Sequence, residues 1–125
     1  RLNNKIRVTD LERTIVDSLD RPDYCGGVNE LDEILKICGV LDETKLANYL
    51  EIYNKQKLYK KAGYFLKRYQ QSLGITDGLL SWIEKRTGNT KSYLNEEARN
   101  GNGMLIKRWG LIVPKNLEAK DDIFV

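Results

Sequence analysis

Apolar residues along most of this chain recur every three or four positions, the spacing that places side chains on one face of an α-helix. The first such stretch carries Leu11, Ile15 and Leu19, and it follows Thr9, which has Glu12 three residues later as in a reciprocal N-terminal cap. The loop DRPDYCGG, with its proline and paired glycines, should end this helix. The same spacing predicts four more helices, over residues 29–38, 43–54, 55–73 and about 76–88.

Local signals mark the ends of several of these helices. Asp42 can cap the helix over 43–54, and Thr76 or Asp77 can cap the helix that follows. Gly74 should terminate the helix over 55–73, the longest that we expect. Its apolar stripe is continuous and consists of Leu58, Ala62, Phe65, Leu66, Tyr69 and Leu73.

Two stretches have the character of β-strands. Residues 5–8 alternate charged and apolar side chains, as in a short strand with one buried face. Residues 104–113 are branched and aromatic, which predicts one bent strand or two short strands hinged at Gly110 and closed by Pro114. Residues 89–103 are polar and should be irregular. The sequence therefore predicts a predominantly helical α+β fold, with about five helices and a small sheet of N- and C-terminal strands.

Composition bounds the class of protein. The chain has 125 residues, 41% of them hydrophobic, which suits a single domain with a buried core. A net charge of +3 permits an anionic partner without demanding one. Only two cysteines occur, and no apolar run approaches the roughly 18 residues of a membrane span, so we expect a cytoplasmic protein without a membrane partner. Because the chain opens on Arg1 rather than Met, we expect a fragment of a longer protein.

The candidate chemistry is sparse. The chain has no histidine, the commonest general base and metal ligand. Cys25 and Cys38 are too few for a structural zinc site, and no histidine can activate either thiol. Gly26 and Gly27 favour a tight turn over a phosphate loop, because the Lys-Ser/Thr of such a loop is missing. We therefore expect no catalytic residue, no metal and no cofactor.

Carboxylates leave one enzymatic alternative open. Acidic side chains are frequent in the first third of the chain, and Asp10 and Asp17 could belong to a magnesium-dependent, nuclease-like module. Their spacing, however, resembles that of ordinary helix caps and solvated helix faces. Metal-dependent cleavage is therefore the less favoured hypothesis.

The most informative surface is the polar side of the helix over 55–73. Helical spacing gathers several cations around Tyr64 there, which predicts a basic face that could hold a nucleic-acid backbone or an acidic protein. A solvated face without a ligand is the alternative. Trp109, next to Lys107 and Arg108, is typical of a buried tryptophan with surface charges beside it. The residues of the predicted binding face are Lys57, Lys60, Lys61, Lys67 and Arg68.

Three motifs in order carry a family resemblance. The strings VTDLERTIVDSLDRPDYCGG, KKAGYFL and KRWGLIVP together resemble the AbiEi-type antitoxins, which are also described as predicted transcriptional regulators of viral defence, or abortive infection, systems. The resemblance spans roughly residues 6–114, and its most specific part is ERTIVD followed by paired glycines. The motif residues Arg13, Asp17, Gly26, Gly27, Gly63 and Tyr64 look architectural: an intrahelical or tertiary ion pair, a turn and a close helix contact at Gly63.

The resemblance implies a two-part protein. An N-terminal winged helix-turn-helix would bind operator DNA upstream of this chain, and residues 1–125 would form the C-terminal effector domain of a type IV toxin–antitoxin system. Its functional partner would be a nucleotidyltransferase-like toxin. One departure is that related chains often carry arginines where this chain has Lys60 and Lys61, which weakens a bidentate phosphate site.

These observations leave one leading hypothesis and two alternatives. The first is a non-enzymatic antitoxin and regulatory domain that acts through the basic helical face and can also contact DNA. The second is a module that forms a homodimer and sets the spacing of DNA-binding domains on a two-fold operator. The third is the metal-dependent nuclease-like module.

Overall fold

The first helix begins one residue later than its predicted cap requires. The computed structural model describes residues 10–122, so Thr9 and the strand expected over 5–8 lie outside the described residues. Helix α1, Leu11–Asp20, is capped by Asp10, whose carboxylate accepts a hydrogen bond from the Arg13 N–H at 2.9 Å. Glu12 is buried and accepts from the Asp42 N–H at 2.8 Å. The predicted cap by Thr9 lies outside the described residues; within them Asp10 caps α1, and Glu12 connects this helix to the start of α3.

The next helices begin and end close to where the sequence predicts. A short helical turn, Pro22–Cys25, leads into α2, Val28–Ile37. Helix α3, Glu43–Tyr53, is capped by Asp42, which accepts hydrogen bonds from the N–H groups of Thr44 and Lys45 at 2.9 and 3.2 Å. Helix α6, Asp77–Glu84, is capped by Thr76. The local cap signals at Asp42 and Thr76 are thus confirmed.

The longest expected helix is divided in two. Helix α4, Gln56–Arg68, ends at Tyr69, whose backbone angles of −118° and 34° are not helical, and α5, Gln70–Leu73, continues to the predicted end at Gly74. The side chain of Tyr69 leaves the helix to donate a hydrogen bond to Asp32 on α2. Apolar spacing alone missed this break, because Leu66 and Leu73 keep their positions in the core on both sides of it.

A three-stranded sheet closes the other side of the molecule. Strand β3, Leu111–Pro114, lies in the middle, parallel to β1, Ser92–Tyr93, and antiparallel to β2, Gly103–Ile106. The region 104–113 therefore forms two strands joined by a turn that ends at Gly110, as predicted. The expectation that 89–103 is irregular is corrected, since it contains β1 and a helical turn over Ala98–Asn102. Helix α7, Lys115–Asp122, was not predicted.

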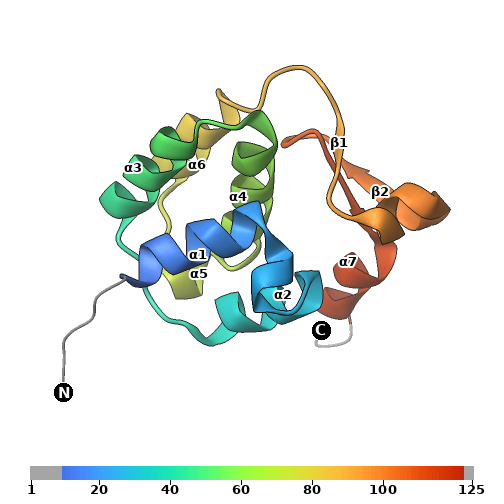
Figure 1. The fold of residues 1–125 in the computed structure, drawn as a ribbon, viewed down its shortest axis with the longest axis horizontal. Helices are drawn as coiled ribbons and strands as arrows, with labels where there is room; N and C mark the ends of the chain where they lie inside the picture. Colours follow the sequence, from blue (N-terminus) through green and yellow to red (C-terminus); the bar gives the residue numbers. More distant parts are fainter. Residues whose placement is uncertain (1–9, 123–125) are drawn as a thin grey trace.

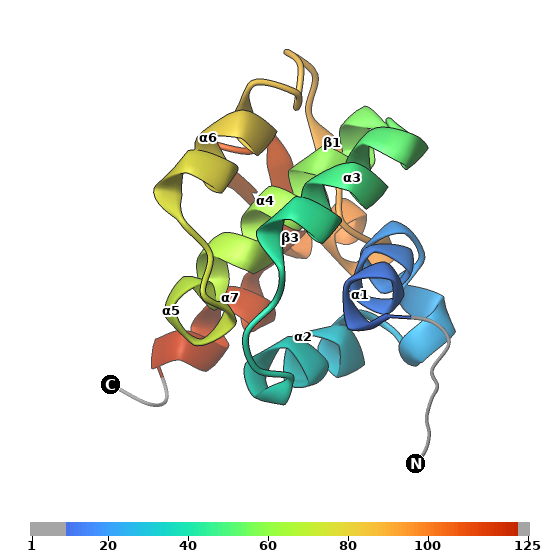
Figure 2. The same cartoon turned by 90° about the vertical axis from the view of Figure 1, so that its left-hand side faces the viewer.

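Helix α4 is the centre of the fold. Helices α1 and α6 pack against it, and β3 of the sheet contacts it as well (Figures 1 and 2). Every residue from Leu58 to Leu66 is buried, so α4 has no solvated face over these two turns. Gly63 lets the ring of Trp109 lie directly on the helix backbone. The fold is predominantly helical α+β, as predicted, with more helices than the five expected.

The described residues include no helix that combines the length and the apolar character needed to cross a membrane.

Candidate functional site

The basic face predicted on α4 is mostly buried. Lys60 and Lys61 are only 1% and 7% exposed, and the side chain of Arg68 is 4% exposed. Lys57 and Lys67 alone among the five predicted binding residues are exposed. The prediction of a continuous solvated face is therefore wrong, because α1, α2, α7 and the loop before β1 bring partners onto the polar side of the helix that the sequence pattern leaves open.

Lys61 connects α4 to the end of α1. Its ammonium donates to the backbone oxygen of Asp20 at 3.0 Å, and the exposed Lys55 lies on the carboxylate of the same aspartate at 3.0 Å. Burial, together with the smaller effect of the Lys57 charge, lowers the pKa of Lys61 to about 8. Lys61 therefore supports the fold and is not available to a partner.

The depressed pKa of Lys61 predicts a pH-dependent stability. Between about pH 8 and 10.5 the unfolded chain binds this proton and the folded chain does not, so stability rises with pH across that window. We expect the free energy of unfolding of the natural chain to rise by about 1–3 kcal/mol relative to Lys61→Met between pH 7.5 and 10. Urea unfolding of the natural chain and of Lys61→Met, at pH 7.5 and at pH 10, measures this difference. Lys67→Met, at an exposed position of the same helix, should keep a constant difference, and a constant difference for Lys61→Met would contradict the assignment.

Arg68 belongs to a buried polar cluster, here the Arg68 cluster, that joins α2, α4 and α7. Its Nε lies 2.9 Å from the carboxylate of Asp32, which is fully buried, and its Nη2 donates to the Leu117 oxygen at 2.8 Å. Tyr69 donates to Asp32 at 2.7 Å, and burial together with this bond raises the pKa of Tyr69 to about 12. Glu118 accepts a hydrogen bond from Tyr64. The Arg68 cluster is architectural, since its groups satisfy one another.

Other motif residues also have structural roles. No ion pair joins Arg13 to Asp17 among the described residues; Asp17 accepts a hydrogen bond from Tyr53 on α3, and Arg13 is exposed. The ion pair expected between them is therefore wrong. Gly26 and Gly27 have φ angles of +102° and +111°, which only glycine adopts readily, and they form the predicted turn into α2.

Lys60 contacts the loop before β1, 30 positions further along the chain. Its ammonium donates to the backbone oxygen and hydroxyl of Thr90, at 2.7 and 3.0 Å, and to the hydroxyl of Ser92 at 2.9 Å. All three partners are neutral oxygens, and no described carboxylate forms an ion pair with Lys60. Burial lowers the pKa of Lys60, and the charge of Lys57 lowers it further. Lys60 is thus a buried cation held directly beneath the loop that precedes β1.

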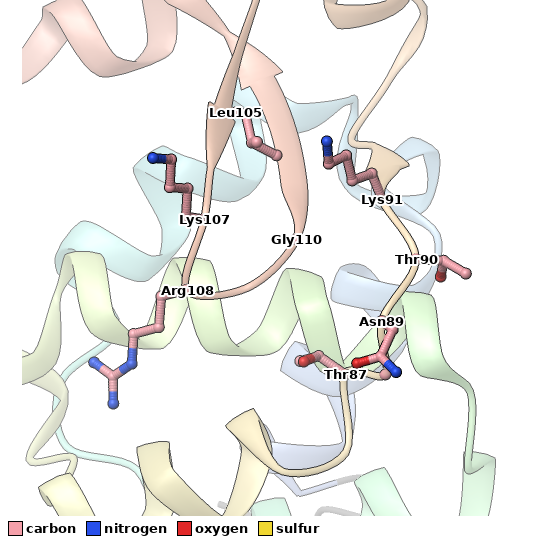
Figure 3. Close-up of a pocket in the computed structure, with 9 residues that line it drawn as sticks. Thr87, Asn89, Thr90, Lys91, Leu105, Lys107, Arg108 and Gly110 are labelled. Carbon is pink, nitrogen blue, oxygen red and sulfur yellow. The ribbon is translucent and has the colours of Figure 1, made fainter.

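That loop borders a cavity of about 350 Å³ at the edge of the sheet. One wall is the loop after α6, and the other is the turn between β2 and β3 (Figure 3). Figure 3 shows Lys91 and Lys107 on opposite sides of Leu105, with the Arg108 guanidinium directed away from both. We call this the basic pocket, lined by Thr87, Gly88, Asn89, Thr90, Lys91, Leu105, Lys107, Arg108 and Gly110.

The basic pocket has a one-sided electrostatic character. None of the described residues that line it is acidic. Arg108 is partly neutralised, since its Nε lies 2.8 Å from Glu84 Oε1 and its guanidinium covers the Trp109 ring. Lys91 and Lys107 are exposed, and neither forms an ion pair with a described residue. With Lys60 behind its wall, this geometry suits an anion.

The carboxylates of the nuclease alternative are engaged elsewhere. Asp10 caps α1 and accepts a hydrogen bond from Tyr49 at 2.7 Å, and these bonds lower its pKa, the one from Tyr49 most. Asp17 is bonded to Tyr53. Among the described residues, no group of three His, Cys, Asp or Glu side chains could hold a metal ion. Cys25 and Cys38 are partly buried free thiols.

The sequence interpretation did not identify Lys91 or Lys107 as binding residues. Lys91 follows the polar stretch TGNT and Lys107 follows the apolar stretch MLI, so neither belongs to an amphipathic helical pattern, and they lie 16 positions apart. The signal that could have indicated them is the concentration of small polar and basic residues over 85–91 beside a second basic group at 107–108.

No protein-family model, curated protein or solved structure matches the chain. The function is therefore inferred from the residues and their geometry.

Proposed function

We propose that this chain is the effector domain of an AbiEi-like antitoxin and transcriptional regulator, and that it acts without catalysis by binding an anionic partner in the basic pocket. One observation carries the proposal: exposed Lys91 and Lys107 line a cavity with no described acidic lining residue, and the buried Lys60 lies behind it. Such a concentration of one charge attracts and orients a partner of the opposite charge.

Binding rather than catalysis is favoured by the side chains at hand. The basic pocket offers amide, hydroxyl and ammonium groups, but no carboxylate, thiol or imidazole among its described residues that could act as a general base. Asp10 and Asp17, on which a nuclease would depend, hold α1 to tyrosines of α3. The antitoxin role itself rests on the motif resemblance, with the basic pocket in place of the α4 face as the binding surface.

The partners follow from the same proposal. A nucleotidyltransferase-like toxin is the functional partner, and operator DNA is bound through a winged helix-turn-helix upstream, with the basic pocket as an additional contact. We place the protein in the cytoplasm, because two free thiols suit a reducing compartment.

A dimerisation module is the second candidate. It is favoured by Ile37 and Val40, which are 81% and 74% exposed at the end of α2 and in the segment after it. Large apolar side chains this exposed and this close in sequence are typical of contact surfaces. On this alternative the chain would set the spacing of two DNA-binding domains and would not counteract a toxin.

The test is a rescue assay with the toxin encoded beside this chain. We expect the chain to restore growth of toxin-expressing cells and Lys91→Gln/Lys107→Gln to lose about tenfold or more of that rescue, because two unpaired cations leave the pocket. Lys36→Gln/Lys67→Gln is the matched control, since it removes two exposed lysines of α2 and α4 outside the pocket lining. Colony counts at equal protein levels give the readout.

The outcomes separate the candidates. Equal rescue by the pocket variant and the control variant would show that the basic pocket is not the binding surface. No rescue by the natural chain would contradict the antitoxin role and favour dimerisation.

A further inference from the structure

The basic pocket holds more positive charge than the described residues neutralise. Lys60 is 1% exposed and donates to three neutral oxygens, while Lys91 and Lys107 have no described ion-pair partner. Only Arg108 is paired, with Glu84. Because burying a cation without a counter-ion is costly, an anion bound beside Thr90 and Gly110 would stabilise this arrangement.

The loop backbone adds neutral donors on the same side. The N–H groups of Gly88, Asn89, Thr90 and Lys91 donate to no acceptor among the described residues, and this loop is exposed. Free backbone N–H groups are frequent ligands of phosphate oxygens, since they add directed hydrogen bonds without a mobile side chain. Lysine side chains and unpaired backbone donors thus both belong to residues that line the cavity.

The size and lining of the basic pocket further restrict the kinds of ligand that can bind. A cavity of about 350 Å³ is at the lower end of small-molecule sites. No aromatic ring is among its described lining residues, so there is no platform on which a nucleobase would stack. Thr87, Asn89 and Thr90 instead offer short polar groups, and Leu105 is the one large apolar side chain. These features suit a compact, highly charged group.

We propose that the basic pocket binds the terminal phosphate of a nucleotide or of a nucleic-acid end. Lys91 and Lys107 would contact its oxygens from two sides, and Lys60 would supply fixed positive charge from behind Thr90 and Gly110. This inference rests on the proposed function, to whose anionic partner it gives a chemical class.

A terminal phosphate fits better than the other common anions. It carries about 1.5 to 2 negative charges at pH 7 on three acceptor oxygens, which matches a cavity lined by two lysines and a loop with unpaired backbone donors. A backbone phosphodiester carries one charge. A carboxylate of an acidic peptide also carries one charge, and it has two oxygens. Lysine is sufficient to bind such a group, because its point charge needs no bidentate geometry. The Lys60 ammonium, for example, donates to three separate oxygens of Thr90 and Ser92.

The experiment is an amide-resolved NMR titration of the full chain. The probes are inorganic phosphate, a nucleoside 5′-monophosphate, and one short oligoribonucleotide with either a 5′-phosphate or a 5′-hydroxyl. We expect saturable shifts of the Gly88, Asn89 and Gly110 amides with each phosphate-bearing probe, and affinity about tenfold or more below the natural chain for Lys91→Gln/Lys107→Gln. Lys36→Gln/Lys67→Gln, with the same change in net charge, should bind as the natural chain does.

Several results would overturn the phosphate assignment. These are equal affinity for the 5′-hydroxyl and 5′-phosphate oligonucleotides, equal loss in both double variants, or equally tight binding of a glutamate-rich peptide. Similar affinity for the mononucleotide and the phosphorylated oligonucleotide would support a free nucleotide as the source, and tighter binding of the oligonucleotide would support a nucleic-acid end. If phosphate binding fails while toxin rescue still depends on Lys91 and Lys107, the proposed function stands without this ligand. If phosphate binds but the chain does not rescue toxin-expressing cells, the phosphate site stands without the proposed antitoxin function.

Discussion

Gly63→Ala should cost the protein about 3 kcal/mol of its free energy of unfolding, because the added methyl group has no space. A Cβ at this position would lie 2.7 Å from Cδ2 of Trp109 and closer still to Cε3 and Cζ3, whereas ordinary contacts are 3.4–4 Å. The indole is 2% exposed and cannot swing away. Helix α4 cannot move away either, because it is buried on every side around Gly63. Denaturant unfolding followed by tryptophan fluorescence measures the loss.

The chain offers a matched control for this substitution. Gly78 is also helical, in the first turn of α6, but an added Cβ there meets only the hydroxyl of Thr76, at 3.7 Å. Gly78→Ala should therefore leave stability unchanged or raise it by about 0.5–1 kcal/mol. In a double-mutant cycle, Trp109→Leu should recover part of the loss in Gly63→Ala, since the smaller side chain makes room. Strictly additive effects would show that the clash is not the cause.

Elements that depend on local signals were predictable from the sequence. Asp42 and Thr76 cap their helices because a short polar side chain can reach the N–H groups two or three residues ahead, wherever the rest of the chain lies. The turn at Gly110 and the end of α5 at Gly74 have the same local origin. The strong amphipathic spacing of α3 and α4 likewise placed their apolar residues in the core.

The polar side of α4 was not predictable in this way. Helical periodicity shows which side chains share a face, but it does not show whether a second layer covers that face. Lys60 and Arg68 are buried because their partners arrive from 30 to 49 positions away, on the loop before β1, on α2 and on α7. A run of lysines and arginines around an apolar stripe therefore has the same pattern whether it is solvated or satisfied inside the protein.

The basic pocket depends on tertiary structure to the same degree. Lys91 and Lys107 line the same cavity only because β1 pairs with β3 in parallel and β2 turns back on β3. A two-residue strand such as β1 carries too little periodicity to be recognised, so neither the pairing nor the cavity beside it could be inferred. Their net charge was visible in the composition, but its location was not.

Asp32→Ala should lower the free energy of unfolding about as strongly as Gly63→Ala does. We expect a loss of about 3–5 kcal/mol, which is about a third or more of a typical domain's stability. The fully buried carboxylate is the partner of Arg68 and Tyr69 at 2.9 and 2.7 Å. Without it, a guanidinium whose side chain is 4% exposed loses the carboxylate at 2.9 Å and keeps the neutral Leu117 oxygen at 2.8 Å and the longer contact to Glu118 at 3.5 Å. Thermal and urea unfolding give the measurement.

Two further variants test whether the uncompensated charge is the cause. Glu96→Ala removes one partner of an exposed ion pair with Arg99, at 3.9 Å, and should change stability by less than about 0.5 kcal/mol. Asp32→Leu/Arg68→Met removes both charges of the buried pair, and it should be more stable than Asp32→Ala although it carries one more substitution, because no buried guanidinium is left without its carboxylate at 2.9 Å. A double variant less stable than Asp32→Ala would instead assign the stabilisation to the hydrogen bonds that the Arg68 cluster makes to Leu117 and Glu118 on α7.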